Sequence, residues 1–447
     1  MQHEITASLW CSLSESGFSL DELVLKLQKL FDSEGFSGLL ELLLNLTQEN
    51  LLLSSNRRWC KCKSSEYVLN GSYPRKVKTS IGVLNLTWRR LKCKCCKLSN
   101  IVPLKSFLGI KSHQYKSNEL ERLIIDGVTK DSYRRSMESL STYGFIRVSH
   151  TTAHRWVMES DCDHFNFSNK IEADNAAVQL IPDGTGFKGK PNLGKADKGD
   201  LKVIVAVDNR GSVFPVGAWA GEDWQTVSEK VKKAVPKFPE DSILVADGEP
   251  GIANAFADMF DEQQRCHWHI TRDMYHAMWQ NGGTVKDSKP IQKALTGILA
   301  VELPKEDFEY VSEVEKDDIE EQIEKSEEMI DALIKHLHRK NYDKAATYLE
   351  NSKKAMFGYV RRWLKTGIIC PRASSLIERV IREVARRIKK VAYNWSNKGC
   401  AKMARILLKK FTDENQWKQF WNEKMNLQNK VMMGIRKIAP SSQNLEH

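Results

Sequence analysis

Two aspartates of this chain stand where a carboxylate could hold a metal ion. Asp247 follows the apolar run ILVA at residues 243–246, and Asp183 follows a similar run at residues 178–182. Short β-branched runs predict buried parallel strands, and the ligands of open α/β sheets collect at the carboxyl ends of such strands. A glycine follows each aspartate and would keep backbone bulk away from a docking ligand. Together the two carboxylates could bind Mg²⁺, a hard ion that prefers oxygen.

A third carboxylate would complete a two-metal site for phosphoryl transfer, in which the attacking and the leaving oxygen are both stabilised. The candidate lies in the basic segment SSLIERVIREVARRIKK at residues 374–390. Steps of about 100° per residue place Glu378 at the border of the apolar face and Glu383 nearly opposite it. Because a catalytic side chain must face the sheet, we expect Glu378 to be the third ligand. The alternative is an ion pair with Arg382, one helical turn away.

A separate metal site is predicted nearer the N-terminus, where five of the ten cysteines lie between residues 60 and 96. Residues 75–89 between them predict a β-hairpin with its turn at residues 80–82. Two cysteine pairs joined by a hairpin are typical of a zinc ribbon, in which four thiolates hold one tetrahedral ion. The expected ligands of this structural Zn²⁺ are Cys60, Cys62, Cys93 and Cys96. Cys95 could replace either neighbour, and free thiols of an intracellular protein are the alternative.

The charge of the chain favours a polyanionic partner, with nucleic acid as the first candidate, because the formal net charge is +11. Residues 300–331 hold 14 acidic and 3 basic side chains, whereas residues 353–410 hold 17 basic and 2 acidic ones. This segregation predicts a solvated acidic helix followed by a basic face suited to DNA phosphates. No apolar run approaches the roughly 18 residues of a membrane span, and the N-terminal residues lack the pattern of a signal peptide.

The N-terminal third is predicted to contain several helices. Residues 19–53 form two amphipathic helices, which we interpret as a packing or dimerisation hairpin. Residues 117–160 resemble a helix-turn-helix, with Ser149 as the N-cap of its second helix and a plain helical hairpin as an equal alternative. The side chains that this second helix would offer to DNA are His150, Thr151, Thr152, His154 and Arg155.

Strands are expected from residue 178 onward and helices from residue 270. The strand region contains an antiparallel hairpin around Asp208, then a helix and the strand before Asp247. Residues 270–367 are almost wholly helical in pattern and include a long, exposed, acidic helix. The other expected elements are strands at 178–182, 201–207, 212–219 and 243–246, and helices at 222–235, 374–392, 395–411 and 414–438.

The compact cluster Cys266-His267-Trp268-His269 follows the Asp247 strand. Thiolate and imidazole are zinc ligands, but two ligands are an incomplete set and no second pair is obvious in the sequence. Packing of the helical segment against the sheet is therefore the favoured role of this cluster. Asp208 and Glu249 are interpreted as turn residues or as support for the main carboxylates.

These motifs follow one another in a recognisable order. Asp-Gly-Thr on the first strand precedes Asp-Gly after the fourth, a Cys-x-x-His motif, a helical insertion and a glutamate on a basic helix. The order resembles that of the Mutator-like bacterial insertion-sequence transposases over roughly residues 175–412. Family members often carry an asparagine shortly before the glutamate, where this chain has Ser374 and Ser375. The residues that match the family's catalytic acids and its Cys-x-x-His motif are Asp183, Asp247, Glu378, Cys266 and His269.

The resemblance implies an α/β fold with a ribonuclease-H-like mixed sheet. An all-helical insertion would interrupt this sheet domain, and a zinc ribbon and a helix-turn-helix would precede it, as in one branch of the family. The implied divisions are a helical hairpin at 1–55, a zinc-ribbon-like domain at 56–110, a helix-turn-helix-like region at 111–170, a catalytic domain at 171–270 and 371–412, an insertion at 271–370 and a basic helical tail at 413–447.

The resemblance also implies a DNA transposase that binds terminal inverted repeats and cuts and joins DNA with two Mg²⁺ (or Mn²⁺) ions per active site. The implied partners are the double-stranded DNA of element ends and target and at least one more copy of the chain. The implied location is the prokaryotic cytoplasm, at the nucleoid. The alternatives are a DNA-binding regulator without catalysis and a nuclease on the same fold. The side chains expected to hold DNA phosphates on the basic helix are Arg379, Arg382, Arg386, Arg387 and Lys390.

Overall fold

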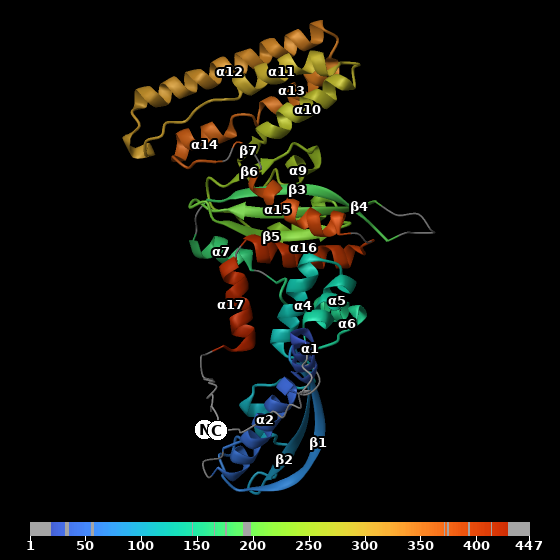
Figure 1. Cartoon of the computed structure of the whole chain (residues 1–447). Coiled ribbons are helices and arrows are strands. Elements are labelled where there is room, and N and C mark those ends of the chain that lie inside the picture. The colour runs from blue at the N-terminus through green and yellow to red at the C-terminus, as the bar shows by residue number, and fades with distance from the viewer. Residues whose placement is uncertain are drawn as a thin grey trace, which may run out of the picture. The chain divides into compact units, whose positions relative to one another are not determined.

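A mixed five-stranded β-sheet lies at the centre of the larger of two compact units in this computed structural model (Figure 1). The larger unit comprises residues 126–136 and 149–414, and the smaller unit comprises residues 1–125, 137–148 and 415–447. The residues that the structure describes are 19–31, 35–54, 58–144, 146–164, 166–174, 177–190, 198–370, 372, 375–391, 394–412 and 414–427.

The sheet has the strand order β5-β4-β3-β6-β7, with β3, β4 and β5 antiparallel and with β6 and β7 parallel to β3. This mixed sheet confirms the α/β class. The predicted hairpin is also confirmed, and the Asp208 carboxylate closes it by accepting the backbone N–H groups of Arg210 and Ser212 at 2.9 and 2.8 Å. The strands are β3 (Gln179–Lys188), β4 (Lys198–Val207), β5 (Val213–Ala220), β6 (Ile243–Ala246) and β7 (Glu262–Arg265).

The prediction that the first strand of the sheet ends before Asp183 is wrong. β3 continues to Lys188 because it pairs with β4 along its whole length, from Gln179 opposite Val207 to Lys188 opposite Lys198. β6 pairs with β3 at Gln179 and Leu180. The parallel part of the sheet therefore ends before Asp183, while the antiparallel part continues beyond it.

The sequence pattern also misses β7, whose residues are polar. This strand pairs in parallel with all four residues of β6 and is held by the segment that leads into helix α14 (Gly358–Thr366). The Gln264 side chain accepts the N–H of Tyr359 at 2.8 Å and donates to the carbonyl of Met356 at 3.1 Å. Gly358 permits the close approach, because a Cβ atom there would lie 2.3 Å from the carbonyl oxygen of Gln263.

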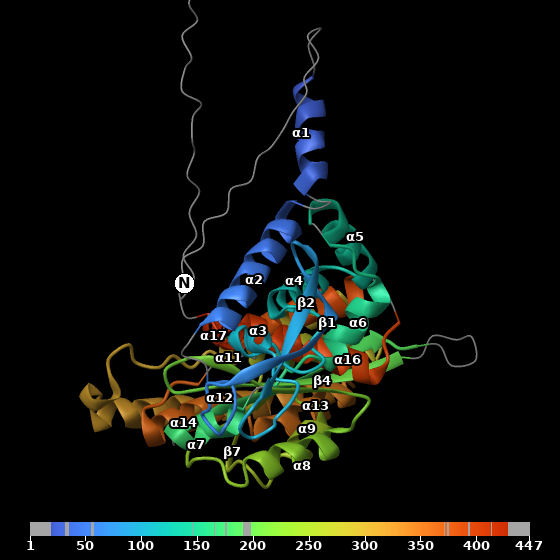
Figure 2. The ribbon, with the colours of Figure 1, turned by 90° about the horizontal axis from the view of Figure 1, so that it is seen from below.

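Side chains alternate between the two faces of the sheet, and different helices cover each face. Leu180, Ile204 and Leu244 share a buried core with residues of α8 and α9. The opposite face is covered by α15, which lies against β3 and β4, and by α16, which lies against β4 and β5. Figure 2 shows α8 and α9 on the far side of the sheet from α16. The helices are α7 (Phe167–Asp174), α8 (Trp224–Ala234), α9 (Pro250–Ala255), α15 (Ser375–Ala385), continued by a π-helical turn (Arg386–Lys390), and α16 (Asn397–Thr412).

In the described residues between β7 and α15, five α-helices form the predicted helical segment. The longest, α12, begins at a capping box in which Ser312 and Glu315 bond reciprocally to each other's backbone and side chain. Its acidic residues are mostly exposed while Ile319, Ile323 and Ile330 are buried, so the predicted long acidic helix is confirmed. The helices are α10 (His267–Trp279), α11 (Val285–Ile298), α12 (Glu313–Arg339), α13 (Asp343–Lys353) and α14 (Gly358–Thr366).

The smaller unit contains a long β-hairpin whose inner face is covered by helix. Leu84, Leu86 and Trp88 pack with Leu44 and Leu51 in one buried core. The predicted hairpin and the two N-terminal helices are confirmed. No described helix combines the length and the apolar content that a bilayer crossing requires. The elements are α1 (Leu20–Leu30), α2 (Phe36–Leu53), β1 (Tyr67–Thr79), β2 (Gly82–Cys93) and α3 (Pro103–Phe107).

The predicted helix-turn-helix region contains helices at the expected places. Helices α4 (Asn118–Lys130) and α5 (Tyr133–Tyr143) each run across the division between the two units, whereas α6 (His150–Glu159) belongs to the larger unit. The C-terminal helix α17 (Glu414–Met425) carries Lys424, which pairs with Glu121 of α4 at 3.1 Å within the smaller unit.

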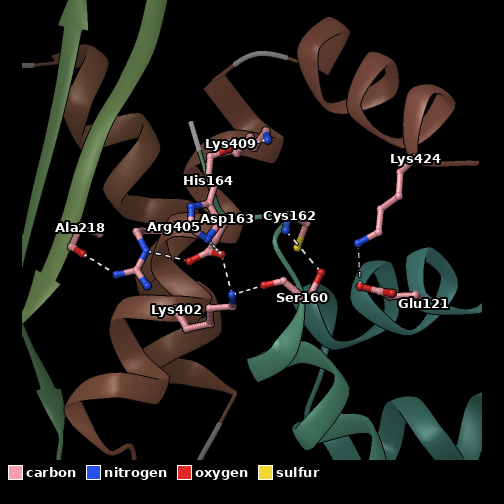
Figure 3. A network of polar contacts seen from close by, with 10 residues as sticks. All are labelled: Glu121, Ser160, Cys162, Asp163, His164, Ala218, Lys402, Arg405, Lys409 and Lys424. Atoms are coloured by element: carbon pink, nitrogen blue, oxygen red, sulfur yellow. Dashed lines mark hydrogen bonds and ion pairs between the residues drawn. The ribbon is translucent and has the colours of Figure 1, made fainter. Parts of the chain in front are cut away.

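A buried ion-pair network fixes α16 in the larger unit (Figure 3). Asp163, whose side chain is 4% exposed, pairs with Lys402 at 2.5 Å and with Arg405 at 2.9 Å. Arg405 also donates to the carbonyl of Ala218 on β5 at 3.2 Å, so the network joins α16 to the sheet. Burial raises the pKa of Asp163, but the two cations outweigh burial and lower its pKa below the ordinary value.

We expect Asp163→Ala to lower the free energy of unfolding by about 3–5 kcal/mol, because it leaves the buried Lys402 without its carboxylate. Since the pKa of Asp163 is lowered, its contribution is present above the ordinary pKa of 3.8 and is lost as pH falls below it. Urea denaturation at pH 7 measures the loss. The control is Asp258→Ala, which breaks an exposed ion pair with Lys232 and should lower the free energy of unfolding far less. Equal losses in the two variants would contradict the role of Asp163.

Candidate active site and metal-binding clusters

The register between β3 and β6 brings Asp183 and Asp247 together. Gln179 pairs with Ile243 and Leu180 with Leu244, so continuing the parallel register aligns Asp183 with Asp247. Neighbouring strands lie about 4.8 Å apart. Side chains alternate along a strand, and each aspartate is three residues from a leucine, Asp183 from Leu180 and Asp247 from Leu244. The aspartates therefore point away from the face where these leucines are buried and toward the face that α15 covers.

The pKa of Asp183 is consistent with a shared location of the three predicted carboxylates. Burial raises the pKa of Asp183 to about 6, and the charges of Asp247 and Glu378 add to this increase. The nearby His269 and the backbone N–H of Gly184 act in the opposite direction without cancelling it. Asp247 at the end of β6 and Glu378 on α15 thus both lie within electrostatic reach of Asp183 on β3. A bound cation would stabilise the ionised form of this group.

Helix α15 presents Glu378 to the site as the helical periodicity predicts. Ile377 and Val384 are buried, and Glu378 is half-buried beside them. Glu383 turns away and pairs with Arg386 at 3.1 Å. The alternative ion pair between Glu378 and Arg382 is not formed among the described residues. The choice of Glu378 over Glu383 is consistent with this geometry.

Cys266 and His269 also reach the site, which the sequence does not reveal. Cys266 is the N-cap of α10, and its N–H donates to the carbonyl of Ala246 at 2.8 Å, so β6 and β7 end side by side at the site. The ligand atoms of Cys266, His269 and Glu378 lie within 4.8 Å of one another. Burial lowers the pKa of His269, but the hydrogen bond with Cys266 and the charge of Asp247 outweigh burial and raise it. The sequence signal for this arrangement is the spacing of Cys266 and His269 at the start of a helix, which places their side chains on the same side.

The neighbours of this pair have other roles. His267 is half-buried and contacts the carbonyl of Met356 through Nε2 at 2.7 Å, and its pKa is lowered to about 4, mainly by desolvation of the ring. Trp268 is 50% exposed and contacts the guanidinium of Arg272.

The expectation that the glycine after Asp247 leaves room for a ligand is wrong. Gly248 has a φ of +98°, and a Cβ atom there would lie 1.6 Å from the guanidinium carbon of Arg265, so this glycine makes room for a residue of the chain itself. The backbone N–H of Glu249 donates to the Asp247 carboxylate at 2.9 Å, which orients that carboxylate. Glu249 itself is exposed.

The basic segment is less available to DNA than its composition predicts. Arg387 is 1% exposed, donates to the carbonyl of Val128 at 2.6 Å, and lies over the ring of Trp395. Including Arg387 among the phosphate-binding residues was therefore wrong, because its guanidinium serves the interior. Arg362 is equally buried. The basic residues of 353–410 that pair with acids are Lys353, Arg361, Lys365, Arg386, Lys402, Arg405 and Lys410.

Several predicted DNA contacts are nevertheless exposed. Arg379, Arg382 and Lys390 project from the α15 region into solvent. On α6, the Ser149 side chain accepts the N–H of Thr152 as the predicted N-cap, at 3.2 Å. Ala153, Trp156 and Val157 form the buried side of α6. The predicted DNA-facing residues of α6 are exposed or half-buried, and they are His150, Thr151, Thr152, His154 and Arg155.

The four predicted zinc ligands converge in the smaller unit. The sulfur atoms of Cys60 and Cys62 lie 2.9 Å apart, each 3.6 Å from that of Cys93, and Cys96 completes a group within 4.8 Å. Four thiolates around Zn²⁺ would be about 3.8 Å apart for Zn–S bonds of about 2.3 Å, so the donor set fits zinc. Cys95 is exposed and lies outside this group.

Pairing at the open end of the hairpin brings the cysteines together. Lys94 donates its N–H to the carbonyl of Glu66 at 3.0 Å, and Cys93 donates to Leu98 at 2.9 Å. Burial raises the pKa of the Cys93 thiol, but the backbone N–H of Cys96 and the other thiols outweigh burial and lower it to about 6. A lowered thiol pKa favours the thiolate that metals bind.

No protein-family model matches this chain, and no curated protein matches it significantly.

We expect Cys96→Ser to remove one equivalent of bound zinc from the purified protein, because three thiolates hold the ion less tightly than four. The matched control is Cys95→Ser, which changes a neighbouring exposed thiol outside the cluster. Mass spectrometry of the metal content after dialysis measures the difference. Equal zinc contents in the two variants would contradict the predicted ligand set.

We expect Asp183→Asn to raise the melting temperature of the metal-free protein at pH 7.5, because the substitution removes a carboxylate that is costly to ionise in the fold. The pKa of Asp183 is raised from 3.8 to about 6, so the folded state binds more protons than the unfolded state between these values. Wild-type stability therefore falls as pH rises through this window, and the advantage of the variant disappears near pH 4. Glu249→Gln, at an exposed carboxylate, is the control. A variant less stable than the wild type at both pH values would refute the assignment.

Proposed function

We propose that this protein is a DDE-type DNA transposase that binds the ends of a mobile element and catalyses metal-dependent cleavage and strand transfer. The observation that carries the proposal is the convergence of Asp183, Asp247 and Glu378 on one face of the sheet, with the pKa of Asp183 raised to about 6. Their order along the chain resembles that of the Mutator-like insertion-sequence transposases. A ribonuclease-H-like domain with a helical insertion, proposed here, would hold these acids.

In this proposal Asp183, Asp247 and Glu378 hold Mg²⁺ or Mn²⁺. The ions would activate the attacking hydroxyl and stabilise the leaving oxygen of an in-line displacement at phosphorus. The backbone N–H of Glu249 holds the Asp247 carboxylate in place, and packing of Ile377 and Val384 fixes the helix that carries Glu378. These contacts order the ligands before the substrate binds. The free energy needed to arrange them is therefore spent during folding and not during the reaction.

DNA would be held by contacts outside the carboxylate group. Arg379, Arg382 and Lys390 are exposed and belong to the same helical region as Glu378, so phosphates bound there would lie along that region. The proposed readers of the terminal repeats are two separate modules, the α6 region and the hairpin that carries the cysteine cluster. Pairing of two element ends requires at least a dimer.

We expect Glu378→Gln to reduce Mg²⁺-dependent cleavage by at least about 100-fold, because an amide cannot replace a charged ligand of the ions. The matched control is Glu383→Gln on the same helix, which loses a surface ion pair and should cleave at nearly the wild-type rate. The substrate is linear DNA that carries the inverted repeats flanking the gene, and both cut and joined products are measured.

Each other result of this assay has a clear meaning. Wild-type activity in Glu378→Gln would refute the assignment of this acid. Cutting by the wild-type protein without joining would identify a nuclease instead of a transposase. Specific binding of the repeats without cutting would identify a regulator.

A further inference from the structure

The Cys266–His269–Glu378 cluster has a chemistry that differs from that of the carboxylate group. Cys266 is fully buried, His269 is 5% exposed, and Glu378 is half-buried. Their ligand atoms lie within 4.8 Å of one another, although Glu378 comes from α15 and the other two residues from the start of α10. A residue at the N-cap and one a turn later face the same side of a helix, so Cys266 and His269 present their donors together.

We propose that Cys266, His269 and Glu378 bind a borderline transition-metal ion, with Zn²⁺ as its representative. A sulfur and an imidazole nitrogen are ligands that Zn²⁺ and its neighbours in the first transition row accept readily, whereas Mg²⁺ prefers oxygen. Bonds of about 2.0–2.3 Å to Zn²⁺ place tetrahedral ligands about 3.3–3.8 Å apart, so the cluster needs a small contraction. Three protein ligands leave a fourth position open, as in catalytic zinc sites.

The surroundings favour a cation at this point. Cys266, His269 and Glu378 all offer electron pairs, and Asp183 and Asp247 lie within electrostatic reach of His269. Arg272, a cation within electrostatic reach of His269, is engaged with the Asp273 carboxylate at 2.6 Å and with the ring of Trp268. The two aspartates and the glutamate concentrate negative charge in a partly buried site. A cation bound here would neutralise part of that charge.

This site would share Glu378 with the proposed Mg²⁺ site, yet it does not depend on DNA cleavage. An ion held by α10 and α15 would tie the first helix after β7 to the helix that covers β3. Zn²⁺ would also compete with Mg²⁺ for the shared carboxylate. Metal bound at this site can be measured directly, so the site can be tested independently of transposase activity.

The test is the zinc content of the full-length protein, dialysed against buffer with millimolar Mg²⁺. We expect two equivalents in the wild type, one in this cluster and one in the four-cysteine cluster. Cys266→Ser and His269→Asn should each lose one equivalent, and Cys96→Ser combined with His269→Asn should lose both. The matched control is His276→Asn, at an exposed histidine of the same helix, which should keep two.

Cobalt substitution supplies a second measurement that does not depend on the number of zinc equivalents. Co²⁺ bound to a thiolate gives a sulfur-to-metal charge-transfer band, and the Cys96→Ser variant should retain such a band from Cys266. Cys266→Ser in that background should abolish it, and circular dichroism should report a folded chain in each variant. A wild-type protein with one equivalent of zinc that disappears entirely in Cys96→Ser would overturn the proposal. So would a folded His269→Asn variant that keeps both equivalents.

Discussion

The parallel register between β3 and β6 is the constraint on which the candidate active site depends. It aligns Asp183 with Asp247 and, through the alternation of side chains, directs both to the face that α15 covers. A slip of one residue would move one aspartate to the face where Leu180 and Leu244 pack with α8 and α9. Burial of those leucines therefore fixes the geometry of the acids.

The same geometry makes ionisation of Asp183 unfavourable in the folded state. Asp183 resists ionisation because it is partly buried and because Asp247 and Glu378 are near it. A site that served only stability would place a cation among them, as the network around Asp163 does with Lys402 and Arg405. The two clusters thus use the same residue type in opposite ways. Around Asp163 the charge is neutralised by the chain itself, whereas a bound metal ion is proposed to neutralise Asp183.

Sequence reasoning succeeded where local pattern determines structure. The apolar run before Asp247, the turn at Asp208 and the helical periodicity around Glu378 are all local, and each was confirmed. β7 was missed because its residues are polar and its stability comes from distant partners, the backbone of β6 and the side-chain bonds between Gln264 and the α14 segment. Composition also could not show that Arg387 is interior, since that depends on the ring of Trp395 and the carbonyl of Val128.

The meeting of Cys266 and His269 with Glu378 is of the same non-local kind. The spacing of the cysteine and the histidine predicts two donors on one side of a helix, and the periodicity of α15 predicts a glutamate facing the sheet. Neither pattern shows that the two helices place these donors within 4.8 Å. The connection arises because β7 runs beside β6 and delivers the start of α10 to the edge where Asp247 lies. The strand that sequence analysis missed is therefore the element that turns an incomplete pair of ligands into a candidate metal site.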